Sequence, residues 1–245
     1  MNVIALHGFT GCGADFAPLA ETCVGKWNCP DLPGHGKASN IDCSVESTLS
    51  YLRSYCQKHS TPRVLVGYSM GARAALNLII QDSNHWRGLI VLSPNPGIED
   101  PMSKEARIVS DAHLAERIES HGIEAFMNDW QSLPIIQSQQ NIRKSWLQNM
   151  NENRLRHTAN GLSNSLRNFG QGVCPNLWPQ LGNLQLPVLC ITGENDTKYC
   201  QISQRMCAIL PNGRHEIIDD AGHMPHLENP EQSFSAIDQF LTQFA

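Results

Sequence analysis

The chain contains the residue types of a serine-based catalytic site, and the first of them lies in a distinctive turn pattern. The segment Gly67-Tyr-Ser-Met-Gly71 places Ser69 between two glycines, as G-x-S-x-G. An apolar run precedes this segment and an alanine-rich run follows it, so a strand is expected to turn sharply into a helix at the serine. Such a turn exposes the hydroxyl at the carboxyl end of a sheet, beside a helix N-terminus. We therefore predict that Ser69 does chemistry, rather than being a buried structural serine.

A serine hydroxyl needs an imidazole to take its proton and a carboxylate to orient that imidazole. On this type of turn the expected chain order is serine, acid, histidine. Asp196 and His223 follow Ser69 in that order, each just after an apolar run that predicts a strand. We predict that these three residues form a catalytic triad. Glu194 is the competing acid, and we favour Asp196 because the acid is expected deeper in its loop.

A second histidine, His226, competes with His223, and the two together have the spacing of a metal-binding pair. Metal ligands at this spacing normally come from a helix, and Pro225 argues against a helix here. We therefore predict no metal site.

Two backbone N–H groups are candidate donors to an oxyanion. In this turn geometry one comes from the residue after the serine, which is Met70. The other comes from the loop after the first strand, at Phe9 in His7-Gly-Phe-Thr-Gly11. We expect the His7 side chain to be structural.

The elements that must position these residues alternate between strands and helices. Apolar runs predict six strands, at 3–6, 27–29, 64–66, 88–93, 186–192 and 215–218. Helical periodicity lies between them, which argues for a mostly parallel sheet covered on both faces.

Between about residues 98 and 182 the strand signals vanish. Four helices are predicted there, at 104–120, 122–131, 135–149 and 152–168. The second half of this insertion is basic, with Glu152 as its one acidic residue between Trp130 and Gly182. We predict a single α/β domain over residues 1–245, with a helical lid inserted after the fourth strand.

The composition argues against several classes of protein. The chain has 245 residues, 41% of them hydrophobic, which suffices for a large core. A net charge of −5 gives no sign of a nucleic-acid or anionic-membrane partner. No apolar stretch approaches the roughly 20 residues needed to span a bilayer. The chain starts in a predicted core strand with no basic region before it, so we expect a cytoplasmic protein. Its nine cysteines are expected to be reduced thiols.

Together the motifs resemble those of the α/β-hydrolase superfamily over nearly the whole chain. They are His7-Gly-Phe, Asp31-Leu-Pro-Gly-His-Gly36, Gly67-Tyr-Ser-Met-Gly71, Gly193-Glu-Asn-Asp196 and Gly222-His-Met-Pro-His226. The resemblance implies an α/β-hydrolase fold. The antiparallel hairpin with which that fold usually opens is expected to be missing, because the sequence leaves no room for it.

Further residues point to one branch of the superfamily. They are Arg73, Glu105-Ala-Arg107 with Ser110-Asp111, Asn128-Asp-Trp130 before Pro134, Arg156 before Asn160-Gly161, and Lys198 after Asp196. In these features the chain resembles the 2-succinyl-6-hydroxy-2,4-cyclohexadiene-1-carboxylate synthases of menaquinone and phylloquinone biosynthesis. That family removes pyruvate from 2-succinyl-5-enolpyruvyl-6-hydroxy-3-cyclohexene-1-carboxylate, a lyase reaction. The resemblance implies no cofactor and no metal.

The same resemblance implies a small polycarboxylate substrate and a set of residues that bind it. These residues are Arg73, Arg107, Arg156, Trp130 and Tyr68. The spacing to Asn160-Gly161 favours Arg156, and Arg154 is the alternative two positions earlier. Independently of the resemblance, Arg73 lies one helical turn after Ser69 on the same face, and arginine suits carboxylates better than lysine does.

In the implied mechanism His223 takes the proton of Ser69, and the serine oxygen acts as a base on the substrate. Two rival functions use the same sequence features. One is a serine carboxylesterase or C–C bond hydrolase acting on a small acidic substrate. The other is an interaction protein without activity, which the intact Ser69, Asp196 and His223 disfavour.

Overall fold

The computed structural model describes residues 1–60 and 63–245, and a six-stranded parallel sheet lies at its centre. The strand order is β2-β1-β3-β4-β5-β6, and each neighbouring pair is parallel. The strands are β1 Asn2–Leu6, β2 Lys26–Asn28, β3 Arg63–Tyr68, β4 Gly88–Leu92, β5 Val188–Gly193 and β6 Gly213–Ile218. The predicted sheet is confirmed.

Helices cover both faces of the sheet, because successive residues of a strand point to opposite sides. On β3, Leu65 packs in a cluster with residues of α2 and α3, whereas Val64 and Val66 pack in a cluster with residues of α1 and α10. The covering helices are α1 Ala17–Thr22, α2 Val45–Gln57, α3 Met70–Gln81, α8 Thr197–Ile209, α9 Pro225–Glu228 and α10 Pro230–Thr242.

Side-chain caps explain where two of these helices begin. Ser44 accepts a hydrogen bond from the Ser47 N–H at the start of α2, and Asn229 accepts one from Gln232 at the start of α10. Each cap satisfies a backbone donor that has no partner within its helix.

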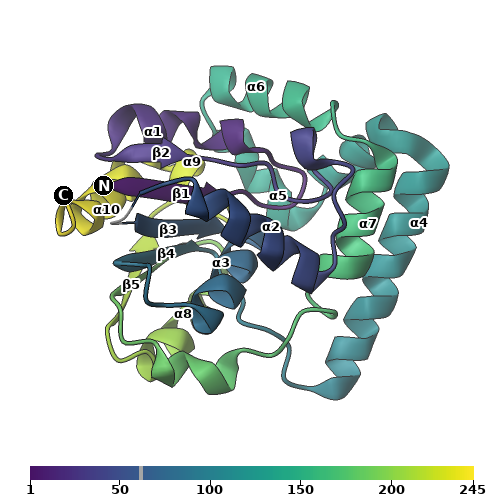
Figure 1. Cartoon of the computed structure of the whole chain (residues 1–245). Helices are drawn as coiled ribbons and strands as arrows, with labels where there is room; N and C mark the ends of the chain where they lie inside the picture. Colours follow the sequence, from purple (N-terminus) through teal and green to yellow (C-terminus); the bar gives the residue numbers. More distant parts are fainter. Residues whose placement is uncertain (61–62) are drawn as a thin grey trace.

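The insertion after β4 forms a lid of four helices beside the carboxyl edge of the sheet. They are α4 Pro101–Gln131, α5 Pro134–Gln137, α6 Lys144–Arg154 and α7 Ala159–Phe169. In Figure 1 the lid helices α4 and α7 pack side by side, and both chain termini lie at the opposite end of the molecule. Within residues 1–60 and 63–245, the helices are too short or too polar to cross a bilayer.

The predicted helix boundaries in the lid are partly wrong. The first two predicted helices both lie within α4, and the predicted break between them is confirmed, because the backbone leaves helical geometry at Gly122, where φ is 79°. The third breaks into α5, a 3₁₀ turn at Ser138–Asn141 and α6. The fourth begins at Ala159 instead of residue 152, because the Thr158 side chain caps α7 by accepting from the Gly161 N–H.

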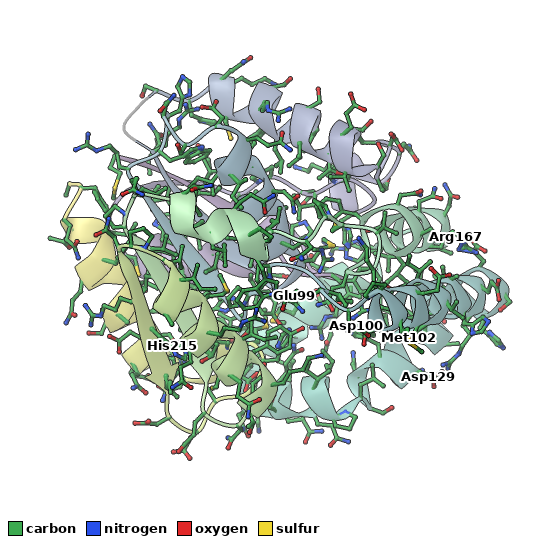
Figure 2. The ribbon with its side chains drawn as sticks, turned by 90° about the horizontal axis from the view of Figure 1, so that it is seen from below. Glu99, Asp100, Met102, Asp129, Arg167 and His215 are labelled. Atoms are coloured by element: carbon green, nitrogen blue, oxygen red, sulfur yellow. The ribbon has the colours of Figure 1, made fainter. Side chains whose placement is uncertain are left out.

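Figure 2 views the molecule from below and shows the outer side of the lid. Asp129 and Arg167 lie there, far from His215 on β6. Both form surface ion pairs, Asp129 with Arg117 and Arg167 with Glu119. These outer arginines are therefore paired away from the sheet edge.

Candidate active site

Ser69 lies at a strained turn between β3 and α3. Its φ is 50° and its ψ is −104°, a conformation that a residue with a side chain seldom adopts. A Cβ on Gly71 would lie 1.9 Å from the Leu6 carbonyl oxygen, and one on Gly67 would lie 2.5 Å from the Gly71 oxygen. Only glycine at both positions lets strand and helix approach closely enough to make the turn.

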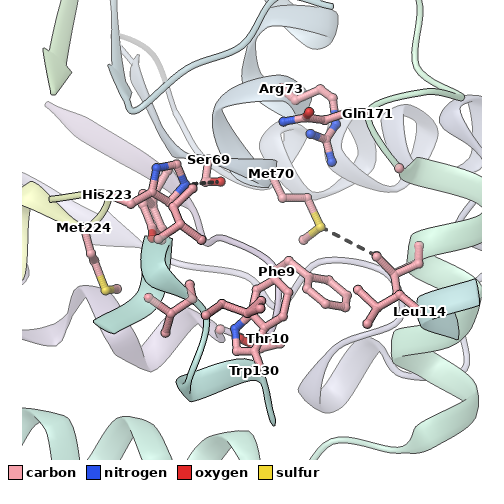
Figure 3. Close-up of a pocket in the computed structure, with 18 of the residues that line it drawn as sticks. Phe9, Thr10, Ser69, Met70, Arg73, Leu114, Trp130, Gln171, His223 and Met224 are labelled. Atoms are coloured by element: carbon pink, nitrogen blue, oxygen red, sulfur yellow. Dashed lines mark hydrogen bonds between the residues drawn. The ribbon is translucent and has the colours of Figure 1, made fainter. Parts of the chain in front are cut away.

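The structure brings the three predicted triad residues together. The Ser69 Oγ lies 3.0 Å from His223 Nε2, and His223 Nδ1 lies 2.6 Å from Asp196 Oδ2. Figure 3 shows the contact between Ser69 and His223 at the edge of a cavity. In this geometry Nδ1 donates to the carboxylate and leaves Nε2 free to accept the serine proton.

The competing residues lie elsewhere. Glu194 is exposed and accepts from the backbone N–H of Asp220 at 3.4 Å. His226 is buried, stacks on Phe16 and packs edge-on against Tyr68. Burial lowers the pKa of His226 to about 3, so this ring is a neutral core residue.

Pro225 begins the short helix α9, so His223 lies before this helix and the two histidines do not share one helix. Pro225 occupies the first turn of α9, where a proline is tolerated because the first N–H groups of a helix need no internal partner. Within the described ranges, no group of three or more histidine, cysteine or acidic side chains has an arrangement that could hold a metal ion.

A buried glutamate that the sequence analysis missed holds the His223 loop. The Glu228 carboxylate accepts from the backbone N–H groups of Gly222 and Met224, on either side of His223. It also accepts from the Ser138 hydroxyl of the lid at 3.0 Å. The sequence feature that could have indicated this role is a carboxylate five residues after the histidine, just before Asn229-Pro230.

The two predicted oxyanion donors have no competing partner. Among the described residues, no hydrogen bond engages the N–H of Phe9 or of Met70. Met70 is the first residue of α3, so its N–H points out of the helix start. Phe9 and Met70 both line the cavity beside Ser69 (Figure 3).

The cavity has a volume of about 250 Å³ and lies between the sheet edge and the lid. Ser69 and His223 line one side of the cavity. The rest is lined by apolar lid residues such as Leu114, Leu133 and Ile136, and by Tyr199 and Gln171. Water-excluding walls with a few placed polar groups are typical of a small-molecule site.

Three arginines line this cavity, and two of them were predicted to do so. Arg73 is buried, donates from Nη2 to the Phe169 carbonyl at 2.9 Å, and has a buried Nε without a partner in the described chain. Arg107 donates to Asp111 at 2.8 Å and to Gln171 at 2.7 Å.

The third arginine is Arg154, the alternative to the predicted Arg156. Arg154 is buried, lines the cavity and donates from Nη2 to Gln139 at 2.6 Å. Arg156 is exposed and borders two surface grooves outside the cavity. The second half of the lid has five basic residues, Arg143, Lys144, Arg154, Arg156 and Arg167, and of these only Arg154 lines the cavity. Arg143 and Arg167 instead pair with surface glutamates.

The two predicted aromatic residues, Tyr68 and Trp130, both line the cavity. Burial raises the pKa of Tyr68 well above its ordinary value, so its hydroxyl stays a neutral donor. Trp130 packs edge-on against Phe9, and its Nε1 is buried without a partner in the described chain.

Asp15 also lines the cavity and was not predicted. It accepts from the Cys12 N–H at 3.0 Å. Burial raises the pKa of Asp15 to about 6, against the opposing effect of the Arg154 charge.

The parallel sheet, the strained serine turn and the hydrogen-bonded triad are the features of an α/β hydrolase. Residues 3–236 match the family described as "Alpha/beta hydrolase family", so the chain belongs to the α/β hydrolase family. Within it, the chain is 34% identical to the putative 2-succinyl-6-hydroxy-2,4-cyclohexadiene-1-carboxylate synthase of Bacillus subtilis (strain 168). The match covers 98% of this chain and 90% of that protein.

Two further comparisons agree with this relationship. The 2-succinyl-6-hydroxy-2,4-cyclohexadiene-1-carboxylate synthase of Photorhabdus laumondii is 30% identical over 99% of this chain and 86% of its own length. The solved structure of MenH from S. aureus superposes with a TM-score of 0.93 at 30% identity, covering 99% of this chain and 94% of that one. The predicted fold and the predicted resemblance are confirmed.

Proposed function

We propose that this protein is a lyase that eliminates pyruvate from 2-succinyl-5-enolpyruvyl-6-hydroxy-3-cyclohexene-1-carboxylate and releases 2-succinyl-6-hydroxy-2,4-cyclohexadiene-1-carboxylate. The observation that carries the proposal is the position of Arg73, Arg107 and Arg154 around the cavity that holds Ser69. The substrate has three carboxylates, one each on its succinyl, enolpyruvyl and ring positions. Arginine binds a carboxylate through two parallel N–H donors, so three arginines suit this charge pattern.

The proposed roles of the triad follow from its hydrogen bonds. His223 Nε2 takes the Ser69 proton, and Asp196 stabilises the imidazolium that forms. The serine oxygen then removes a ring proton α to the succinyl ketone. The electron pair of the broken C–H bond moves through the ring to form the diene, and the C–O bond to the enolpyruvyl group breaks. The released enolpyruvate takes up the proton held by His223 and becomes pyruvate, which leaves Ser69 protonated and His223 neutral again, with no covalent bond to the enzyme.

In this scheme negative charge collects on the ketone oxygen as the α proton leaves. We assign the N–H groups of Phe9 and Met70 to that oxygen, since both line the cavity beside Ser69 and have no other partner in the described chain. Fixed donors of this kind stabilise the transition state because they need no reorientation during the reaction.

The proposal extends to the setting of the reaction. Substrate and product carry several negative charges and do not cross a bilayer unaided, so we place the reaction in the cytoplasm, with residues 1–245 acting as one catalytic domain.

An assay of pyruvate release tests the proposal against a plain esterase or C–C bond hydrolase. We expect the purified protein to release pyruvate from the enolpyruvyl cyclohexene substrate and to turn over p-nitrophenyl esters poorly. Ser69→Ala should lose pyruvate release, and intact-protein mass spectrometry during turnover should detect no acyl-enzyme. Efficient hydrolysis of short esters without pyruvate release would contradict the lyase, and turnover of neither would favour an interaction protein.

A further inference from the structure

A histidine of the lid, His157, makes a buried link to the loop that carries Phe9. It lies between α6 and α7 and is 5% exposed. Its Nε2 lies 2.9 Å from the Thr10 carbonyl oxygen, and its Nδ1 accepts from the Gly36 N–H at 3.2 Å. The ring therefore has one donor and one acceptor, which is the pattern of a neutral imidazole protonated on Nε2.

Thr10, the residue after Phe9, is held at both of its backbone groups. Its carbonyl accepts from His157, and its N–H donates to His35 Nε2 at 3.3 Å. Thr10 has a φ of 65°, a conformation that a non-glycine residue keeps only when its surroundings hold it. The peptide that presents the Phe9 N–H is thus fixed by contacts just after it along the chain.

The backbone of the lid packs closely against the loop that contains Gly34. A Cβ on Gly161 at the start of α7 would lie 2.4 Å from the Gly34 oxygen, and one on Gly34 would lie 2.5 Å from the Gly161 oxygen. This approach holds the 31–36 loop against the lid beside His157. From α7, the Ser165 hydroxyl contacts Met70 Sδ at 3.6 Å, so the lid also touches the residue of the second oxyanion donor.

We propose that His157 is a positioning residue that uses its bond to the Thr10 carbonyl to hold the Phe9 N–H in place for the reaction. His157 does not line the cavity, so it acts through the loop and not on the substrate. The inference rests on the proposed function only for the choice of reaction to assay, because a hydrolase would place its oxyanion at the same donors.

Two substitutions separate the two bonds of His157. The amide nitrogen of glutamine is separated from Cα by the same number of bonds as Nε2 of histidine. His157→Gln can therefore keep the hydrogen bond to the Thr10 carbonyl. The amide oxygen of asparagine is separated from Cα by the same number of bonds as Nδ1 of histidine. His157→Asn can therefore keep the hydrogen bond from the Gly36 N–H, but its side chain is too short to reach the Thr10 carbonyl. His113, an exposed residue of α4, provides the matched control His113→Gln.

We expect His157→Asn to lower kcat about tenfold or more with little change in KM, since an oxyanion donor acts on the transition state and not on ground-state binding. His157→Gln should retain kcat within about threefold of the wild-type value, and the His113 control should match the wild type. A purely structural role would give both His157 variants the same loss, and a role for the Gly36 bond would reverse their order. Either result would overturn the proposal.

Hydrogen exchange gives a readout that needs no activity. We expect amide exchange in residues 8–11 to be faster in His157→Asn than in the wild type, and unchanged in His157→Gln. If the asparagine variant does not fold, a folded His157→Gln protein with a tenfold lower kcat still refutes the idea. If the wild type releases no pyruvate but cleaves esters, the proposed function fails, and the same comparison on esters decides the role of His157.

Discussion

At the scale of single residues, the three cavity arginines differ in how fully their donors are used. Arg107 is neutralised by Asp111. Arg154 donates to the neutral Gln139 and Asn151 side chains, with Asp15 as the nearby negative charge. Within the described chain, Arg73 donates only to the Phe169 carbonyl. In that same part of the chain, Arg73 and Arg154 both form no ion pair and both leave a buried Nε without a partner. A buried donor without a partner is costly, and Arg73 uses the fewest of its donors, so it has the most to gain from a substrate carboxylate.

The Arg73→Ala variant tests this ranking. Loss of one partner of a buried charge pair costs about 2–5 kcal/mol, so we expect kcat/KM for pyruvate release to fall by roughly 30-fold or more. Arg156→Ala is the matched control, because Arg156 is exposed and borders the surface grooves only. Equal effects in the two variants would remove Arg73 from the binding site.

At the scale of elements, the site depends on how closely α3 approaches β1 and β3. The alanines of α3 bury that helix against the sheet, and Gly71 brings its first turn onto the end of β1. The same close contact sets the strained conformation of Ser69, so the turn and the helix packing cannot be separated.

We expect Gly71→Ala to lower the free energy of unfolding by about 3 kcal/mol or more, since the added methyl group would overlap the Leu6 backbone. Activity should fall as well, because the helix must move and Ser69 moves with it. Gly182→Ala serves as the control, since its nearest atoms would lie 3.9 Å away, and it should change stability by less than about 0.5 kcal/mol. Urea denaturation measures both, and an unchanged Gly71→Ala protein would contradict the close-packing argument.

At the scale of the whole molecule, buried neutral histidines make the stability depend on pH. Burial lowers the pKa of His7 to about 4 and of His226 to about 3, and it also lowers those of His35 and His157. The unfolded chain binds protons to these residues near pH 6.5, and the folded chain does so only at lower pH. Their stabilising contribution is therefore full above about pH 6.5 and is lost as the pH falls toward the folded values.

We expect the free energy of unfolding to decrease by at least about 2 kcal/mol between pH 7 and pH 4.5. Asp15 opposes this trend, because burial raises its pKa to about 6 and the folded state then binds the extra proton. Burial also raises the pKa of Asp111, which acts in the same direction as Asp15, and the four buried histidines outnumber these two carboxyls. Replacing His226 with leucine should reduce the slope of stability against pH, and an unchanged slope would show that this ring does not titrate as expected.

Local patterns in the chain were enough to predict the sheet, the serine turn and the triad. Strand periodicity and the G-x-S-x-G segment act over a few residues, and the chain order of Ser69, Asp196 and His223 places all three at one edge of a parallel sheet. The caps at Ser44 and Asn229 are local in the same way, since a cap acts within a single turn.

Only the tertiary structure decided which lid residues reach the site. Residues 154 and 156 lie about half a helical turn apart, so their directions depend on where α6 ends, and that end is determined by packing around Thr158 and Gly161. The contacts of Glu228 with the His223 loop and of His157 with Thr10 likewise join segments that no local pattern connects. The sequence by itself thus determined the catalytic chemistry, whereas long-range packing decided which charges surround it, because side-chain direction in a lid depends on the surface beneath it.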